Sequence, residues 1–279
     1  MGFTFQDSRV IITGGAGGIG RETSLLLLGL GARLAVWDFN KDALDAFQQE
    51  CANLGYSIHC EICDVTDYPE VDRALARSVE ALSGLDVLIN NAGYVANGFF
   101  QEREFHFWSR TLTINLEALM YLSYQSLETL EKSSDSRIVN ISSAAGVIGT
   151  AGLAAYSAAK WGVWGFSEAL RQEIHTRGNT NPGVTTIHPS YLAKGMFEGA
   201  RLKGLGALIV PLVKSHKDVA KAIVRSIRKR KNRVMLPRSV ASAIFFRAIL
   251  PDSWFQGFTR LLNVHSSMSG WKGQGRSID

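Results

Sequence analysis

Short, uniformly apolar runs alternate with helical patterns through residues 1–200, and this alternation restricts the folds open to the chain. The predicted strands are residues 9–13, 33–38, 57–63, 86–90, 137–142 and 184–188; the predicted helices are one running through 25–30, then 42–54, 69–82, 105–130 and 156–176. Strands that are apolar on both faces need cover on both sides, and helical connections make successive strands parallel. The pattern therefore predicts the α/β class, with a single doubly wound parallel sheet.

The chain of 279 residues is 46% hydrophobic, which is enough to build a core and excludes the disordered and fibrous classes. We expect one domain, with residues 1–200 as its core and residues 201–279 as an extension of the same domain. In the extension, residues 205–213 and 240–250 are apolar, 218–230 and 254–264 are predicted helices, and 233–236 is a possible last strand.

No segment is predicted to cross a membrane. The longest stretch without charge, residues 138–159, contains several polar side chains, among them Asn140 and Thr150. The first residues lack the basic and apolar regions of a signal peptide. Three cysteines are too few for a disulfide framework, and the histidine spacing predicts no metal site. We therefore expect a cytoplasmic protein with reduced thiols.

A cluster of glycines separates the first predicted strand from the helix that follows it. The segment reads Thr13-Gly14-Gly15-Ala16-Gly17-Gly18-Ile19-Gly20 and satisfies both G-x-G-x-x-G and T-G-x-x-x-G-x-G. Glycines let the backbone turn sharply and approach a pyrophosphate, whose charge is stabilised at a helix N-terminus. In this context the cluster predicts a dinucleotide site in a Rossmann-type sheet, although a plain tight turn has the same composition.

Asp38 strengthens the dinucleotide interpretation. It ends the second predicted strand, 18 residues beyond Gly20, where a carboxylate can accept hydrogen bonds from the adenine-ribose hydroxyls. The same carboxylate would repel a 2′-phosphate, and Phe39 and Asn40 precede the next basic residue, Lys41. The pattern therefore favours NAD over NADP, and the alternative is that Asp38 caps a helix.

A tyrosine and a lysine lie four residues apart in a predicted helix. Tyr156 and Lys160 therefore share a helix face, and Ser143 follows the fifth predicted strand, 13 residues before Tyr156. A phenol has a pKa of about 10, too high for a base at neutral pH, but a nearby ammonium favours the phenolate. This set predicts proton transfer to or from an alcohol. Ser142 is the neighbouring candidate for the serine.

Taken in order, the motifs resemble those of the short-chain dehydrogenase/reductases over roughly residues 8–200. They are the glycine cluster, Asp64-Val65, Asn90-Asn91-Ala92-Gly93, Asn115, Ser143 and Tyr156-x-x-x-Lys160. The resemblance implies that Tyr156 exchanges a proton with the substrate oxygen, while Lys160 lowers its pKa and holds the nicotinamide ribose. It further implies that Ser143 polarises the carbinol or carbonyl, and that Asn115 anchors a water that relays protons from Lys160.

The same resemblance implies the remaining cofactor contacts. Asp64 and Val65 would contact adenine, and Asn90, Asn91 and Gly93 would flank the adenosine ribose and stiffen the fourth strand. After the sixth strand, the family's P-G-x-x-x-T segment begins here with Pro189, but its threonine is replaced by Lys194. Either the backbone of Leu192 suffices to orient the nicotinamide ring, or the grip on the cofactor is weakened.

The C-terminal third is similar to the membrane-associated retinol dehydrogenases of the epidermal type and to lipid-droplet 17β-hydroxysteroid dehydrogenases. The similar segments are residues 195–199, 235–238, 249–251 and 263–268. This resemblance implies a lipophilic alcohol as substrate, a retinoid, steroid or long-chain alcohol, oxidised with NAD. We expect the apolar residues 205–213 to form part of the substrate pocket's wall. The alternatives are an NADP-dependent carbonyl reductase of a small metabolite and a non-catalytic dinucleotide-binding scaffold. Relatives often pair through the helices that carry Asn115 and Tyr156, which implies a homodimer or homotetramer.

Charge is divided unevenly along the chain. Residues 201–279 carry 16 basic and 3 acidic side chains, whereas residues 1–200 carry 14 basic and 22 acidic ones. The basic run 228–233 precedes aromatic segments in which Trp254, Phe258, Leu261 and Leu262 share a helical face. This combination favours peripheral binding to an anionic membrane surface. The alternative is that the apolar face covers the substrate pocket; nucleic-acid binding is not expected, since no reader motif is present.

Overall fold

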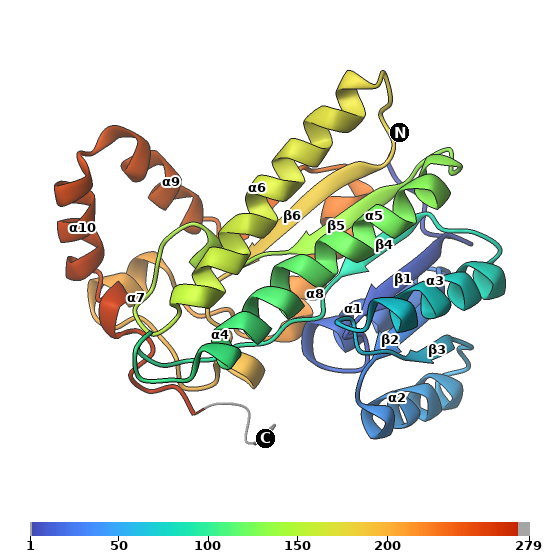
Figure 1. The fold of residues 1–279 in the computed structure, drawn as a ribbon, viewed down its shortest axis with the longest axis horizontal. Helices are drawn as coiled ribbons and strands as arrows, with labels where there is room; N and C mark the ends of the chain where they lie inside the picture. The colour runs from blue at the N-terminus through green and yellow to red at the C-terminus, as the bar shows by residue number, and fades with distance from the viewer. Residues whose placement is uncertain (1, 273–279) are drawn as a thin grey trace.

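The computed structural model describes residues 2–272 and shows a parallel sheet of seven strands (Figure 1). The strands are β1 (Arg9–Thr13), β2 (Arg33–Asp38), β3 (His59–Ile62), β4 (Val87–Asn90), β5 (Arg137–Ile141), β6 (Gly183–Pro189) and β7 (Arg233–Leu236). Their order in the sheet is β3-β2-β1-β4-β5-β6-β7. From β1, the strands β2 and β3 are added on one side, and the strands from β4 to β7 are added on the other. This change of side between β1 and β4 confirms the prediction of a doubly wound sheet.

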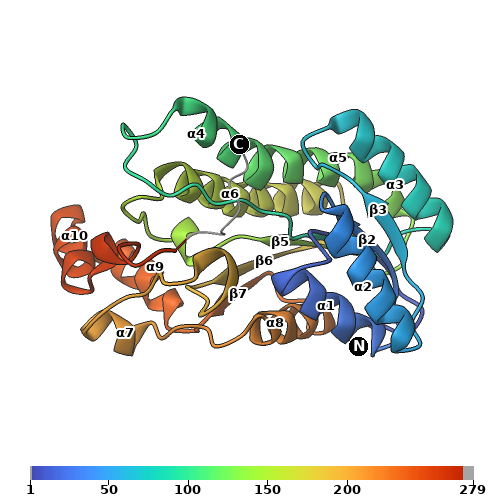
Figure 2. The ribbon, with the colours of Figure 1, turned by 90° about the horizontal axis from the view of Figure 1, so that it is seen from below.

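Helices cover both faces of the sheet, as the view along its edge shows (Figure 2). One layer contains α1 (Gly18–Leu28), α2 (Lys41–Asn53) and α8 (His216–Arg228), and the other contains α3 (Tyr68–Leu82), α4 (Phe105–Leu112), α5 (Ala118–Glu131) and α6 (Ala154–Thr176). Each layer packs on its own hydrophobic core. Side chains of one strand enter both cores in alternation: Ile12 lies in the first and Ile11 in the second.

Local sequence explains where several helices begin. The Asn40 side chain caps α2 by accepting from the Ala43 backbone N–H at 3.0 Å, and Asp67 caps α3 by accepting from that of Glu70 at 3.0 Å. Pro69 follows in the first turn of α3, where its missing N–H costs no hydrogen bond. The predicted bounds of these helices differ from the observed ones by one residue at the affected ends, because the pattern of apolar residues does not register the cap.

The long helix predicted over residues 105–130 is wrong in one respect. It is interrupted by a π-helical turn, η1 (Thr113–Glu117), which separates α4 from α5. A π turn inserts an extra residue into the helix and is frequent at functional sites. Asn115 lies within this turn. The predicted strand over residues 57–63 is also too long, since β3 contains only His59–Ile62.

The C-terminal part of the described chain adds to the sheet and then leaves it. α8 packs along α1, and β7 pairs with β6 at the edge. Beyond the carboxyl ends of β6 and β7, three helices gather at one end of the molecule: α7 (Leu205–Ile209), α9 (Val240–Ile249) and α10 (Asp252–Leu261) (Figures 1 and 2). Because α8 and β7 complete the sheet layers, we expect residues 201–272 to fold with the core as one domain. Residues 273–279 of the predicted extension lie outside the described residues. None of the described helices combines the length and the apolar character needed to cross a bilayer.

Candidate active site

A cleft of about 1660 Å³ lies at the carboxyl ends of the central strands, where the topology of a doubly wound sheet places its ligand site. Most of the predicted site residues line it: Gly14, Gly17, Gly18, Ile19, Asp38, Asp64, Val65, Asn91, Gly93, Asn115, Ser143, Tyr156, Lys160, Pro189 and Leu192. Gly15, Gly20 and Asn90 do not line the cleft. Residues far apart in sequence are thus assembled around one cavity.

The glycine loop has the tight geometry that a diphosphate requires. Gly14 and Gly18 adopt φ values of +59° and +51°, in the left-handed region that favours glycine. A side chain at Gly20 would place its Cβ 2.1 Å from the carbonyl oxygen of Gly14, so helix α1 approaches the loop more closely than any other residue allows. Asn91 fastens the loop to β4, donating through Nδ2 to the carbonyls of Thr13 at 3.0 Å and Gly14 at 2.9 Å. These residues fit a dinucleotide.

Gly15 and Asn90 support the site from behind the cleft wall. A Cβ on Gly15 would lie 2.7 Å from Cγ1 of Val36, so this glycine permits close packing on β2. Asn90 is buried and donates through Nδ2 to Ser123 Oγ at 3.0 Å and to Asn140 Oδ1 at 2.8 Å. It ties β4 to β5 and α5, whereas the ribose contact implied by the family resemblance is not one that its buried position offers.

Asp38 ends β2 beside the glycine loop. Its carboxylate accepts hydrogen bonds from the backbone N–H of Ala16 at 3.3 Å and of Asn40 at 3.1 Å. Partial burial raises the pKa of this carboxyl, and the backbone hydrogen bonds counteract the rise. Because Asp38 also lines the cleft, part of the carboxylate is left to accept hydrogen bonds from a ligand.

Tyr156 and Lys160 lie on the first turns of α6, with Nζ of Lys160 5.7 Å from the centroid of the Tyr156 ring. Both side chains are buried. Burial raises the pKa of the Tyr156 hydroxyl above its ordinary range, and a hydrogen bond with the Ser143 side chain lowers it only in part. Burial also lowers the pKa of Lys160 to about 7. Burial is the largest influence on the Tyr156 pKa in the protein alone, and the lowering by Lys160 that the resemblance implies stays a prediction.

The two neighbouring serines after β5 have different roles. Ser142 donates its hydroxyl to the carbonyl of Lys160 at 2.8 Å, which fastens α6 to the sheet. Ser143 lies near enough to Tyr156 to lower the pKa of its hydroxyl, and Oγ of Ser143 accepts from the backbone N–H of Ala145 at 3.1 Å. This geometry supports Ser143 over Ser142 as the serine nearer the chemistry, and that role stays a prediction. Nζ of Lys160 donates to the carbonyl of Ile141 at 2.8 Å, so all three polar side chains are held at the end of β5.

The π turn aims the side chain of Asn115 at the loop after β4. Its Nδ2 donates to the carbonyls of Tyr94 at 2.7 Å and Thr111 at 2.9 Å, and its Oδ1 accepts from the Tyr94 backbone N–H at 3.3 Å. A Cβ on Gly93 would meet Oδ1 of Asn115 at 3.1 Å and Nζ of Lys160 at 4.0 Å. The absence of a side chain at Gly93 therefore leaves a short path between Asn115 and Lys160.

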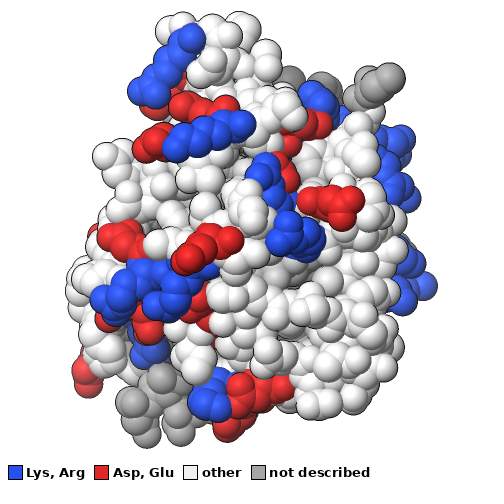
Figure 3. Space-filling model, turned by 90° about the vertical axis from the view of Figure 1, so that its right-hand side faces the viewer, with Lys and Arg blue, Asp and Glu red and all other residues white. Residues whose placement is uncertain are grey.

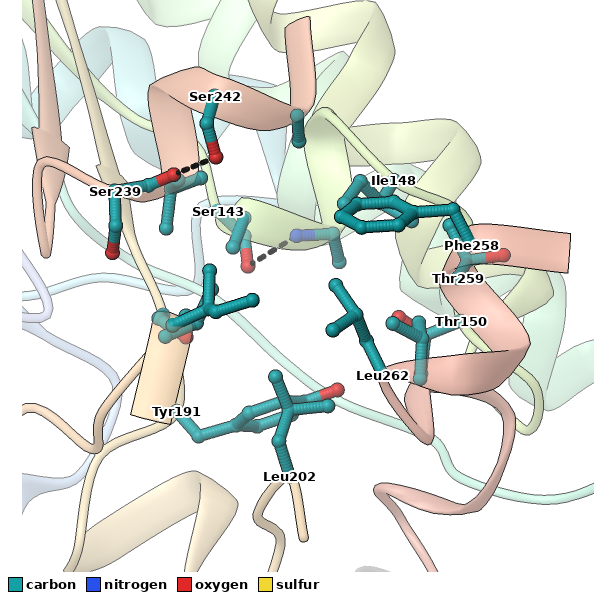
Figure 4. A pocket seen from close by; sticks show the side chains of 18 of the residues that line it. Ser143, Ile148, Thr150, Tyr191, Leu202, Ser239, Ser242, Phe258, Thr259 and Leu262 are labelled. Atoms are coloured by element: carbon teal, nitrogen blue, oxygen red, sulfur yellow. Dashed lines mark hydrogen bonds between the residues drawn. The ribbon is translucent and has the colours of Figure 1, made fainter. Parts of the chain in front are cut away.

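A second cavity of about 790 Å³ joins the cleft at Ser143 (Figure 4). Phe255, Phe258 and Leu262 line it from the C-terminal helices, and most of the remaining lining is aliphatic or aromatic. The close-up shows Phe258, Thr259 and Leu262 gathered on one side and Ser143 with Tyr191 facing the space between them. The largely apolar lining is typical of a site for an apolar small molecule.

The predicted wall over residues 205–213 contributes only in part. Ile209 and Val210 line the second cavity, but Leu208 is exposed to solvent. Val213 instead lies in the core and pairs with Leu192. Short-range apolar patterns do not distinguish these three environments.

Several cleft residues were not predicted from sequence. Arg110 of α4, Lys194 and His216 of α8 line the cleft with basic side chains. The sequence marks Lys194 only as a departure from the family pattern, and the histidine spacing does not single out His216. No local signal marks His216, because it reaches the cleft through the packing of α8 on α1.

Comparisons with known proteins agree with this site. Residues 8–203 match the family model described as short chain dehydrogenase. The chain is 29% identical to mouse epidermal retinol dehydrogenase 2, over 95% of this chain and 85% of that protein. It is 26% identical to mouse estradiol 17-beta-dehydrogenase 11, over 91% of this chain and 84% of that protein.

A solved short-chain dehydrogenase/reductase from Burkholderia phymatum, in complex with NAD, has the same fold. Its TM-score is 0.78 at 20% identity, covering 88% of this chain and 94% of that one. The family match covers more than half of the sequence. The chain therefore belongs to the short-chain dehydrogenases, and it is an oxidoreductase of alcohols and carbonyl compounds.

Proposed function

We propose that the protein interconverts a lipophilic alcohol and its carbonyl compound with NAD, and that Tyr156 carries the proton. The junction of the two cavities at Ser143 is the observation that supports this most strongly. It places the Tyr156–Ser143 pair between a cleft fitted to a dinucleotide and an apolar pocket. When bound, the nicotinamide accepts or returns the hydride; the residues of this chain handle the oxygen and its proton.

In the direction of oxidation, Tyr156 takes the hydroxyl proton of the alcohol. The positive charge of oxidised nicotinamide and that of a protonated Lys160 favour the phenolate over the phenol. Ser143 donates a hydrogen bond to the substrate oxygen and holds it beside the phenolate. Lys160 then exchanges a proton with solvent through a water that Asn115 would anchor beside Gly93.

The cofactor is proposed to be NAD because of Asp38. A 2′-phosphate beside its carboxylate would meet like charge in a partly buried place, where screening by solvent is weak. Asp64 and Val65 line the same end of the cleft and are proposed to contact adenine. A clear preference for NADPH in a binding titration would contradict this assignment.

The apolar pocket supports a retinoid, a steroid or a long-chain alcohol as substrate, in keeping with the names of the relatives. The direct test follows NADH formation with retinol, a 17β-hydroxysteroid and a long-chain alcohol, each with NAD and with NADP. Turnover of one of them with NAD, abolished in Tyr156→Phe, is the expected result. Activity confined to small polar alcohols would contradict the substrate class.

We further propose that the outer faces of α7, α9 and α10 bind an anionic lipid surface. Large apolar side chains are exposed there, among them Leu208 (79%), Trp254 (70%) and Phe245 (60%). Arg247 and Arg260 flank them, and α9 and α10 contain a single acidic residue. The opposite end of the molecule carries acidic and basic side chains close together instead (Figure 3).

The basic run 228–233 does not join this surface. It lies between α8 and the amino end of β7, whereas α9 follows the carboxyl end of that strand. The basic run and the aromatic helix were expected to form one surface, but they lie at opposite ends of β7. The proposed lipid contact rests on the exposed apolar residues and their own arginines.

Sedimentation with anionic vesicles tests the lipid surface. The double variant Trp254→Ser with Leu261→Ser is expected to lose most of its binding. Leu54→Ser, which removes an equally exposed leucine after α2, is the matched control and should bind as the parent does. Equal binding by all three proteins would refute the proposal.

A homodimer or homotetramer is proposed through α4, α5 and α6. Met120 and Tyr124 on α5 and Trp161 on α6 are exposed apolar side chains on this layer. Light scattering of the purified protein tests the oligomeric state, and Tyr124→Arg should shift it towards the monomer.

A further inference from the structure

Two further side chains line the cleft, those of Lys194 and His216. Burial lowers the pKa of His216, so its imidazole is uncharged at neutral pH and offers a hydrogen bond, whereas Lys194 offers a positive charge. Lys194 precedes the short helix η3 (Gly195–Phe197), and His216 begins α8. Both line the cleft beside Gly17 and Gly18. Neither has a role in the proton transfer described above.

The position of His216 is set by two glycines. A Cβ placed on Gly18 would lie 3.7 Å from Nε2 of His216, and one placed on Gly195 would lie 2.9 Å from the same atom. The imidazole therefore spans the gap between the glycine loop and the loop after β6. Its Nε2 edge faces the turn from which α1 begins, where a bound anion would be stabilised by the helix N-terminus.

The glycine loop has no free cation of its own. The nearest basic residue on α1 is Arg21, whose guanidinium donates to Glu50 at 2.9 Å and to Glu22 at 2.8 Å. A diphosphate on this loop would find backbone N–H groups and glycine, but no positive charge from α1. Two phosphate groups carry about two negative charges, which a partly enclosed site must balance.

Apart from Lys194, the cations at the cleft are engaged elsewhere. Among the described residues that line it, the basic ones besides the pair are Arg110 and Lys160. Arg110 lies over the ring of Tyr94 at 5.5 Å, and Lys160 donates to the carbonyl of Ile141 at 2.8 Å. Lys194 is exposed, with a side chain long enough to turn into the cleft.

The geometry points to Lys194 and His216 as a clamp on the diphosphate of the dinucleotide, closing over it from the lip opposite the glycine loop. The inference rests on the proposed cofactor site and extends it to residues outside the family pattern. The lysine at the position of the family's threonine then strengthens cofactor binding through its charge. This answers the question raised by the sequence, where the loss of the threonine also allowed weaker binding.

Two ligands, one with and one without the nicotinamide, distinguish a contact to the diphosphate from a contact to the nicotinamide. Dissociation constants of NADH and of adenosine diphosphate ribose, which lacks the nicotinamide, are measured by calorimetry for the parent, Lys194→Met and His216→Ala. Each substitution is expected to weaken both ligands about fivefold, the effect of one partly exposed ion pair or hydrogen bond to a charged group. Added salt should weaken ligand binding by the parent more than binding by Lys194→Met, because salt screens the lysine charge that the variant lacks.

Lys217→Met is the matched control. It removes an exposed lysine of α8 that does not line the cleft, so both ligands should bind as they do to the parent. Thermal unfolding of each variant checks that it is folded.

Three results would overturn the clamp. The first is unchanged affinity for both ligands in both variants. The second is a loss of affinity for NADH alone, which would place the contact at the nicotinamide. The third is an equal loss of affinity in Lys217→Met. Failure of the parent itself to bind either ligand would instead contradict the proposed dinucleotide site.

Discussion

Replacing Lys160 by methionine should stabilise the protein while removing its activity. The lysine is 4% exposed, and burial alone lowers its pKa to about 7, with no carboxylate near enough to offset it. A buried ammonium without a counter-ion costs free energy in the folded state. Methionine has a similar length and shape and carries no charge, so it removes this cost.

The size of the effect follows from the pKa of Lys160. A fall from 10.5 to about 7 corresponds to ~5 kcal/mol when both states are protonated. Methionine also loses the hydrogen bond from Nζ to the carbonyl of Ile141, which costs about 1 kcal/mol. The variant should therefore be more stable by ~4 kcal/mol below pH 7.

The pH dependence identifies the cause. Because the folded pKa is the lower one, the penalty is complete below about pH 7 and fades as the pH rises towards the unfolded value of 10.5. At about pH 9 it has fallen to ~2 kcal/mol, so the advantage of Lys160→Met should shrink by ~3 kcal/mol between about pH 6 and about pH 9.

Urea unfolding followed by tryptophan fluorescence at these two pH values measures the difference. Lys217→Met, which removes an exposed lysine, is the control and should leave stability nearly unchanged at both. A constant gain across the pH range would attribute the stabilisation to packing and refute the argument from charge. No gain at all would show that Lys160 is solvated in the folded protein.

Three further predictions concern the cofactor and the proton. Tyr156→Phe should lower kcat by about 10²–10⁴ while the Kd of NADH stays within about twofold, as measured by parallel kinetics and titration; because burial raises the Tyr156 pKa, oxidation by the parent should speed up as the pH rises. Asp38→Asn should weaken the binding of NADH by about tenfold and reduce the preference for NADH over NADPH in competition binding. An unchanged ratio of the two affinities would show that Asp38 does not determine the choice of cofactor. Gly20→Ala should abolish NADH binding or cost about 3 kcal/mol in urea unfolding, because its Cβ would meet the Gly14 carbonyl, and a variant with parental affinity and stability would contradict the loop geometry.

Sequence predicts the parts of the site that depend on local spacing. Tyr156 and Lys160 come together because four residues make about one helical turn, and Gly14 and Gly20 meet because a strand turns directly into a helix. Parallel strands end at the same edge of the sheet, so the position of Ser143 after β5 already predicts that it lies near the glycine loop and Tyr156.

The unpredicted parts depend on packing between distant segments or on backbone irregularity. His216 meets Gly18 only because α8 lies along α1, and no spacing along the chain records that contact. The π turn at Asn115 leaves a continuous helical pattern in the sequence, because a single extra residue shifts the apolar face without breaking it.

The substrate pocket was the hardest part to predict because its helices are apolar on more than one side. In α10, Phe255 is buried and lines the pocket, whereas Trp254 and Leu261 face solvent. The expected single face of residues 254, 258, 261 and 262 is thus divided: Leu262 turns inward and Leu261 outward. An amphipathic pattern identifies an apolar surface but not what covers it. If the outward residues contact lipid, α10 faces the membrane on one side and the substrate pocket on the other. Substrate choice and membrane contact would then be set by alternate residues of the same ten-residue helix.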